Sequence, residues 1–133
     1  MDVVIDASVI MAVLTSEPER AAIVRLTREA NLLAPSSVHW EVGNALSSML
    51  KRRRLTLAQA KGAIQNYIQI PIRFVEVDLA EALEIAANQN LYAYDAYLLA
   101  CARSQRTALI SLDKALIRSA KATGLDTIEV PDQ

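Results

Sequence analysis

The chain has 133 residues, of which 53% are hydrophobic and 22% are charged. This composition supports a substantial core and excludes an intrinsically disordered chain, and the length fits one domain spanning residues 1–133. One cysteine and one histidine exclude an internal disulfide and a cysteine-based zinc site, so any metal site must use mostly oxygen ligands. The net charge of −1 does not mark the whole molecule as a nucleic-acid-binding protein.

The sequence carries no signal for a membrane or for export. No apolar run approaches the roughly 18 residues that a membrane-spanning helix needs. Residues 1–6 are acidic and lack the basic start of a signal peptide. We therefore expect a cytoplasmic protein with no membrane partner.

Hydrophobic patterning in the first half of the chain predicts two strands and four helices. Val3, Val4 and Ile5 form a continuous β-branched run, which is typical of a strand buried on both faces. Pro18 follows two possible capping residues and fits the first turn of a helix. The predicted elements are a strand over 3–5, a helix over 8–14, a helix from 16–18 to about 30, a strand over 32–34, and helices over about 36–53 and 57–68.

The second half of the chain alternates in the same way. Asp78 precedes an apolar stripe at helical spacing and is expected to cap that helix. Residues 94–104 are apolar almost all round, which predicts a buried helix. The predicted elements are a strand over 74–77, a helix after Asp78, a helix over 94–104, a strand over 108–110, a helix over 114–122 and an edge strand over 127–130.

This alternation of short buried strands with helices predicts an α/β fold. The expected architecture is a three-layer α/β/α sandwich around a mostly parallel five-stranded sheet. In such sheets, binding sites lie beyond the carboxyl ends of the strands. The residues that follow each strand are therefore the first candidates for a functional site.

Two acids occupy such positions. Asp6 follows the first predicted strand and Asp113 the fourth, with Ser8 and Ser111 beside them. Each acid is also a good N-cap for the helix that follows it, and taken singly, capping explains each one. Their common place at one sheet edge is what makes the pair a candidate site.

Two further acids lie on helix faces that should point inward. Asp95 shares a side of its predicted helix with Leu98 and Leu99, although a first-turn acid also complements the helix dipole. Glu41 lies within the apolar stripe of its helix, and Asn44 follows on that side. An unpaired buried carboxylate is costly, so Glu41 needs a cationic partner, either an arginine or a metal ion.

The four acids together favour a metal site. Clustered carboxylates repel one another, and a hard divalent cation relieves that repulsion. Oxygen ligands without histidine or cysteine favour Mg²⁺ or Mn²⁺ over zinc. Such a metal commonly serves phosphoryl chemistry by activating water and neutralising charge on the phosphate.

Four motifs occur along the chain in a fixed order. They are Val-Val-Ile-Asp-Ala-Ser-Val-Ile at 3–10, Trp-Glu-Val-Gly-Asn-Ala-Leu at 40–46, Tyr-Asp-Ala-Tyr-Leu-Leu-Ala at 94–100 and Ile-Ser-Leu-Asp at 110–113. In this order they resemble the PIN-domain ribonucleases, and within that family the toxin subunits of VapBC-type toxin–antitoxin pairs. The resemblance covers essentially the full length of the chain.

The resemblance implies Mg²⁺- or Mn²⁺-dependent endonucleolytic cleavage of single-stranded or loop RNA. It also implies a homodimer and inhibition by a cognate antitoxin protein. Relatives often carry a further acid and an aromatic residue where this chain has Ala115 and Leu116, which puts a second metal in question. The implied catalytic and metal-binding residues are Asp6, Glu41, Asp95 and Asp113, with Ser8, Asn44 and Ser111 in support.

Other residues could serve an RNA substrate or a partner. Basic residues at helix ends are ordinarily solvated cations, but some could contact RNA phosphates. The helical hairpin over 37–68 has apolar surface in excess, so we expect it to line a partner groove. His39, Trp40 and Cys101 are interpreted as structural. The candidate RNA-binding residues are Arg52, Arg53, Arg103 and Lys114, with Tyr92, Tyr94 and Tyr97 as possible stacking partners.

Alternative functions stay open at this point. A PIN-like fold could serve as a catalytically silent RNA- or protein-binding module. A phosphatase with an Asp nucleophile would need a second acid where Ser8 stands, and a phospho-receiver would need paired acids after the first strand. Nucleotide-binding loops are excluded because the glycines are isolated.

Overall fold

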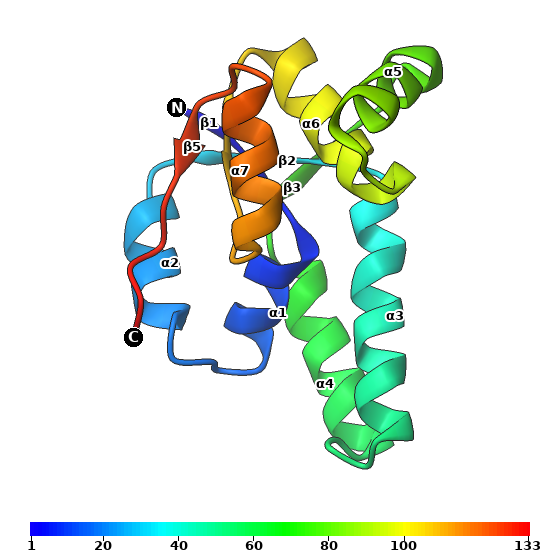
Figure 1. Cartoon of the computed structure of the whole chain (residues 1–133). Helices are drawn as coiled ribbons and strands as arrows, with labels where there is room; N and C mark the ends of the chain where they lie inside the picture. The colour runs from blue at the N-terminus through cyan, green and yellow to red at the C-terminus, as the bar shows by residue number, and fades with distance from the viewer.

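A five-stranded sheet forms the centre of the computed structural model, which describes residues 1–133 (Figure 1). The strand order is β3-β2-β1-β4-β5, and every neighbouring pair is parallel. The strands are β1 (Asp2–Ile5), β2 (Asn31–Pro35), β3 (Ile72–Val75), β4 (Ala108–Ile110) and β5 (Thr127–Ile128).

Seven helices connect and cover the strands. None of them combines the length and the hydropathy that a bilayer-crossing segment requires. The helices are α1 (Ala7–Leu14), α2 (Arg20–Thr27), α3 (Ser37–Lys51), α4 (Leu57–Ile68), α5 (Leu79–Gln89), α6 (Ala93–Gln105) and α7 (Lys114–Ala122).

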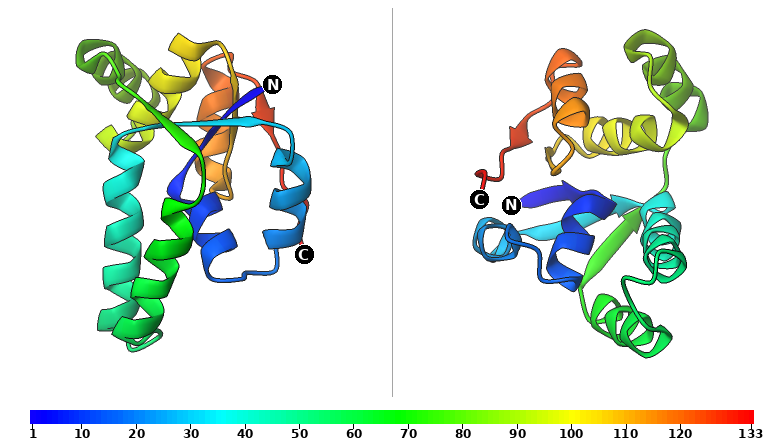
Figure 2. Two further views of the ribbon diagram at one scale, coloured as in Figure 1. Left: turned by 180° about the vertical axis from the view of Figure 1, so that it is seen from behind. Right: turned by 60° about the horizontal axis from the view of Figure 1, so that its bottom comes forward.

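The helices lie on both faces of the sheet, which confirms the predicted three-layer α/β/α fold. Figure 2 shows α5, α6 and α7 on one side of the strands and α1, α2 and α4 on the other. Helices α3 and α4 form a hairpin that extends away from the sheet (Figure 1). Since all strands are parallel, their carboxyl ends share one edge, where α1, α3 and α7 begin.

The core consists of the central strands and the helix that crosses them. Val3, Val4 and Ile5 of β1 are buried, as the continuous apolar run predicts. Helix α6 contributes six buried residues from Ala96 to Ala102. Its first turn differs from the prediction of burial all round, because Tyr94 is 58% exposed.

Local sequence signals determine where two of the helices begin. Thr56 and Gln59 form a reciprocal capping box at the start of α4, with side chain–backbone distances of 3.1 and 2.9 Å. Asp78 accepts a hydrogen bond from the Glu81 N–H at 3.2 Å and caps α5. Both predicted helix starts are confirmed.

Three predicted boundaries are wrong. Helix α2 begins at Arg20 rather than at 16–18, because Ser16 lies with a left-handed φ of 53° in the turn after α1, and it ends at Thr27 rather than near residue 30, shortly before β2 starts at Asn31. Strand β3 is Ile72–Val75 rather than 74–77, because its pairing with β2 ends where Pro35 meets Val75. Strand β5 keeps only two residues, because β4 ends at Ile110 and leaves no partner further along.

We predict that Leu99→Ala destabilises the protein strongly. Leu99 has 0% exposure in the middle of α6, so its truncation leaves a cavity and lowers the free energy of unfolding by about 2–5 kcal/mol. Leu83→Ala on α5 is the matched control, because Leu83 is 55% exposed and its loss costs about 0.5 kcal/mol or less. Urea unfolding measures both, and equal losses would contradict this packing.

Candidate active site

Asp6 lies at the end of β1 and caps α1, and it is the one charged residue of the chain that is buried, with 5% exposed. Its Oδ1 accepts hydrogen bonds from Ser8 Oγ at 2.6 Å and from the Val9 N–H at 3.1 Å. Its Oδ2 accepts a hydrogen bond from Ser111 Oγ at 2.5 Å. The carboxylate is therefore held in one orientation by three donors, none of which carries a charge.

The two serines also join the ends of neighbouring strands. Ser8 Oγ accepts the Leu112 N–H at 3.0 Å, and Ser111 Oγ accepts the Asp113 N–H at 2.9 Å. Each hydroxyl thus donates to Asp6 and accepts from the backbone that follows β4. Ser8 and Ser111 therefore both lie beside Asp6, as the sequence suggested.

Asp113 caps α7 at the same edge of the sheet. Its Oδ1 accepts the N–H groups of Ala115 at 3.0 Å and Leu116 at 3.2 Å. Capping therefore accounts for one oxygen of the side chain, whereas Oδ2 makes no hydrogen bond and is available to a ligand. The structural and the functional interpretation of Asp113 are compatible.

Glu41 and Asp95 reach the site from helices. Glu41 is half-buried in the second turn of α3, where burial and then the charges of Asp6 and Asp95 raise its pKa from 4.5 to about 7. Asp95 is partly buried in the first turn of α6, and burial followed by the charge of Asp113 raises its pKa. Burial also raises the pKa of Asp6, with a smaller contribution from Asp113.

These charge interactions form a closed ring. Asp6 repels Asp113, Asp113 repels Asp95, Asp95 repels Glu41, and Glu41 repels Asp6. The three ion pairs of the structure, Arg103–Glu81, Lys114–Asp132 and Lys121–Glu129, involve none of these acids. The four carboxylates therefore interact through their charges, none of them is in an ion pair with a protein cation, and they are called the carboxylate ring below.

The donor set fits a hard divalent cation. All four side chains offer oxygen ligands, and like charges around one centre are stabilised when a cation lies between them. As they stand, no three of the acids are grouped closely enough to enclose a metal ion.

The other candidate residues lie outside this ring. Asn44 is exposed on α3 and its side chain makes no hydrogen bond. Arg52 and Arg53 lie at the far end of α3, about 16 Å along the helix axis from Glu41. The structure therefore does not bring Arg52 and Arg53 to the carboxylates, whereas Asn44 lies one turn after Glu41 on the same helix, so its supporting role stays a prediction.

The two remaining basic candidates differ from each other. Arg103 lies in the last turn of α6 and pairs with Glu81 at 3.7 Å, two turns from Asp95. Lys114 directly follows Asp113 and is the only one of the four candidate cations next to the ring.

Sequence reasoning also missed features around the site. Trp40 is 74% exposed beside Glu41, so it is not the structural residue that we expected, whereas Cys101 is buried as expected. The Val9 N–H that donates to Asp6 is the helix cap that the sequence predicted for this residue. Arg118 and Lys121 continue from Lys114 along α7, and the sequence interpretation took such basic residues as solvated cations at helix ends.

Comparison with known proteins identifies the family. The profile of the PIN domain family matches residues 3–122. The chain is 31% identical over 122 residues to the VapC ribonuclease Mb0985 of Mycobacterium bovis, covering 90% of this chain and 92% of that protein. Ribonuclease VapC9 of Mycobacterium tuberculosis matches with the same identity and coverage.

Solved structures share the fold at lower sequence identity. PAE2754 from Pyrobaculum aerophilum has a TM-score of 0.72 at 23% identity, covering 96% of this chain and 92% of that one. VapBC2 from Rickettsia felis, solved bound to a DNA fragment from its promoter, has a TM-score of 0.67 at 11% identity, covering 96% and 98%. The match of the family profile and the identity to the mycobacterial proteins lead to one conclusion: the chain belongs to the PIN-domain family, among the VapC ribonucleases.

Proposed function

We propose that the protein is a metal-dependent endoribonuclease that cleaves single-stranded or loop RNA in the cytoplasm, as the toxin of a toxin–antitoxin pair. The observation that carries this proposal is the ring of four mutually repelling carboxylates at the carboxyl ends of the strands. The ribonuclease activity in the names of the mycobacterial relatives supports it.

Asp6, Asp95 and Asp113 are the residues proposed to hold Mg²⁺ or Mn²⁺. A bound divalent cation activates water and neutralises charge that develops on a phosphate. Ser8 and Ser111 fix the carboxylate of Asp6 through hydrogen bonds to both of its oxygens. Asp113 contributes the oxygen that capping leaves free.

Glu41 has a different environment, and we assign it to the metal or to the orientation of the attacking water. It is half-buried, whereas Asp6 is buried. A carboxylate in that place can hold a water by accepting its hydrogen bond. In this arrangement Asp6 would hold the metal, and Glu41 would either bind it as well or orient the attacking water from α3.

The residue two positions after Asp6 disfavours the phosphatase alternative. A phosphatase with an Asp nucleophile would have a second acid there, and this chain has Ser8, whose hydroxyl donates to Asp6. We therefore assign Asp6 to the metal and not to nucleophilic attack.

A groove between α1, α3 and α4 is a candidate binding site for an antitoxin. The groove is about 730 Å³ and is lined by Met11, Leu14, Met49 and Leu55 together with polar residues at its rim. It includes the helical hairpin that the sequence suggested for a partner. We propose that an amphipathic segment of an antitoxin packs its apolar face against this groove.

We also propose that the toxin itself is a homodimer.

The first test is cleavage of a mixed structured RNA with Mg²⁺ or Mn²⁺ after any copurifying antitoxin is removed. Asp6→Asn and Asp95→Asn should each lower the rate by on the order of 10²-fold or more, because each removes a charge from the ring. Glu84→Gln on the exposed face of α5 is the control and should keep the wild-type rate. Equal cutting by the Asp variants and the wild type would contradict the proposed site.

A second prediction concerns pH and stability without metal. The pKa of Glu41 is raised in the folded state, so folding takes up a proton, and the free energy of unfolding falls as pH rises from 4.5 to about 7. Glu41→Gln removes this loss. Its free energy of unfolding relative to the wild type should therefore rise by about 1 kcal/mol from pH 5 to pH 8, a small value because solvent screens a half-buried group.

The measurement is urea unfolding of both proteins in a chelator at the two pH values, with Glu84→Gln as the control. Adding Mg²⁺ at pH 8 should stabilise the wild type, because a ligand that binds only the folded state raises its stability. If the difference in the free energy of unfolding between Glu41→Gln and the wild type does not change with pH, the raised pKa of Glu41 is contradicted.

A further inference from the structure

Helix α7 carries a row of cations that begins next to the carboxylate ring. Lys114, Arg118 and Lys121 are spaced four and three residues apart, so they share one face of the helix. The row, called here the α7 basic stripe, starts directly after Asp113 and extends about 10 Å along the helix axis. It is the only row of cations at helical spacing that starts at a member of the ring.

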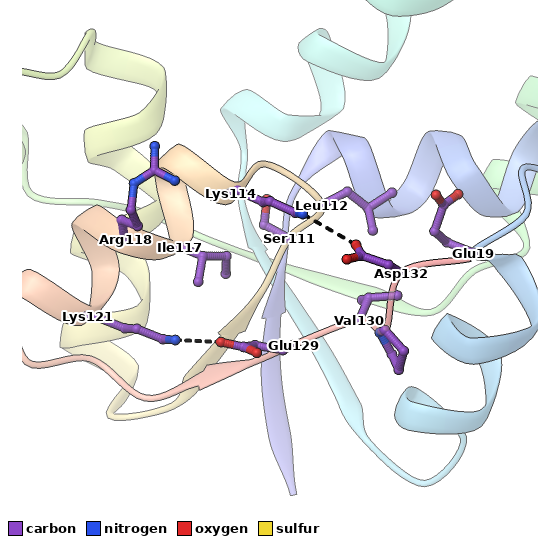
Figure 3. A pocket seen from close by; sticks show the side chains of 11 residues that line it. Glu19, Ser111, Leu112, Lys114, Ile117, Arg118, Lys121, Glu129, Val130 and Asp132 are labelled. Atoms are coloured by element: carbon purple, nitrogen blue, oxygen red, sulfur yellow. Dashed lines mark hydrogen bonds and ion pairs between the residues drawn. The ribbon is translucent and has the colours of Figure 1, made fainter.

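The C-terminal segment of the chain lies along this stripe. Figure 3 shows Lys121 paired with Glu129 and Lys114 paired with Asp132, at 2.5 and 3.4 Å. Arg118, between the two lysines, makes no ion pair. The residues around the stripe enclose a hollow of about 660 Å³ that also includes Ser111, the serine that donates to Asp6.

The acidic segment is held weakly. Both ion pairs are exposed at the surface, with the side chains of Lys114 and Asp132 76% and 87% exposed. Surface pairs of this kind contribute at most about 1 kcal/mol, and salt screens them. Beyond Ile128 the segment has no regular secondary structure, and Val130 anchors it to the core between Glu129 and Asp132, whose side chains are exposed.

A polyanion can replace both carboxylates of the segment at once. A single-stranded nucleic acid that contacts several cations releases its condensed counterions, which favours binding. The stripe has the repeated positive charges for such contacts, and it leads straight to the carboxylates where an RNA phosphodiester would be cut. This continuity favours RNA over an acidic peptide as the ligand.

We propose that the α7 basic stripe binds the phosphate backbone of the RNA substrate next to the cleavage site, and that Glu129 and Asp132 of the chain's own C-terminal segment occupy the stripe until RNA displaces them. The proposal rests on the ribonuclease function proposed above and adds the path of the RNA strand and a competitor for it.

Binding is measured apart from cleavage. In an Asp6→Asn background, the fluorescence anisotropy of a labelled oligouridine reports affinity at several salt concentrations. Arg118→Gln with Lys121→Gln should weaken binding roughly fivefold per lost contact at about 0.1 M salt and lower the salt slope by about 0.7 per contact. Arg25→Gln with Lys61→Gln, at exposed positions on α2 and α4, changes the net charge equally and is the control.

The competing segment is tested by the opposite change. Glu129→Gln with Asp132→Asn should tighten oligouridine binding several-fold more than Glu76→Gln with Glu84→Gln, which removes the same charge elsewhere. The gain should disappear when Lys114 and Lys121 are both changed to Gln, because Glu129 and Asp132 then have no lysine to pair with and no longer compete with RNA. Thermal unfolding of each variant verifies that it folds.

Each outcome decides a separate claim. If the stripe variant and its control bind oligouridine equally while the wild type cleaves RNA, the RNA path on α7 is overturned and the ribonuclease function stands. If the segment variant and its control bind equally, competition by the segment is overturned. If the wild type does not cleave RNA and the Asp6→Asn protein does not bind oligouridine, both proposals fail.

Discussion

The burial of the Asp6 carboxylate is the constraint on which the rest of the site depends. A charged group with 5% exposure needs several hydrogen bonds to remain ionised in the core, and Asp6 obtains them from Ser8, Val9 and Ser111. Two of these donors belong to α1 and one follows β4, so the end of β1 is joined to its neighbouring strand. The ends of the two central strands are thereby held in one arrangement.

These hydrogen bonds satisfy the polarity of Asp6 but leave its charge uncompensated. Glu41, Asp95 and Asp113 add further negative charge, and burial together with mutual repulsion raises the pKa of Asp6, Glu41 and Asp95. The protein places its paired cations elsewhere, in surface ion pairs on α6 and α7. This concentration of charge costs stability in the metal-free state, and it is what the divalent cation proposed above would offset on binding.

The parallel sheet determines which helices can contribute to the site. Since every strand ends at one edge, α1, α3 and α7 start there, and the acids that they contribute lie at their N-caps or within their first two turns. Residues late in these helices are carried away from it, as Arg52 and Arg53 show at the distal end of α3. Lys114, in the first turn of α7, is close for the same reason. Proximity to a helix start, rather than basic character, therefore selects the cations that can serve the site.

Much of the fold followed from local patterns. The continuous apolar strands, the capping box at Thr56 and the aspartate cap at Asp78 all have physical signals within a few residues, and they predicted a parallel α/β/α sandwich. The boundaries of β3 and β5 did not follow, because they depend on where a partner strand stops. A strand ends where its neighbouring strand stops pairing with it, so the end cannot be predicted from the sequence of one segment alone.

The site divides in the same way. The sequence by itself determined the chemistry, because Asp6 and Asp113 after strands and Glu41 and Asp95 on apolar helix faces offer only oxygen ligands. Only the tertiary structure decided that their charges form a ring, that Ser8 and Ser111 share Asp6, and that the acidic C-terminal segment lies on α7. Contacts such as Ser111 with Asp6 join residues 105 positions apart, and packing of the whole chain, not local preference, brings such residues together.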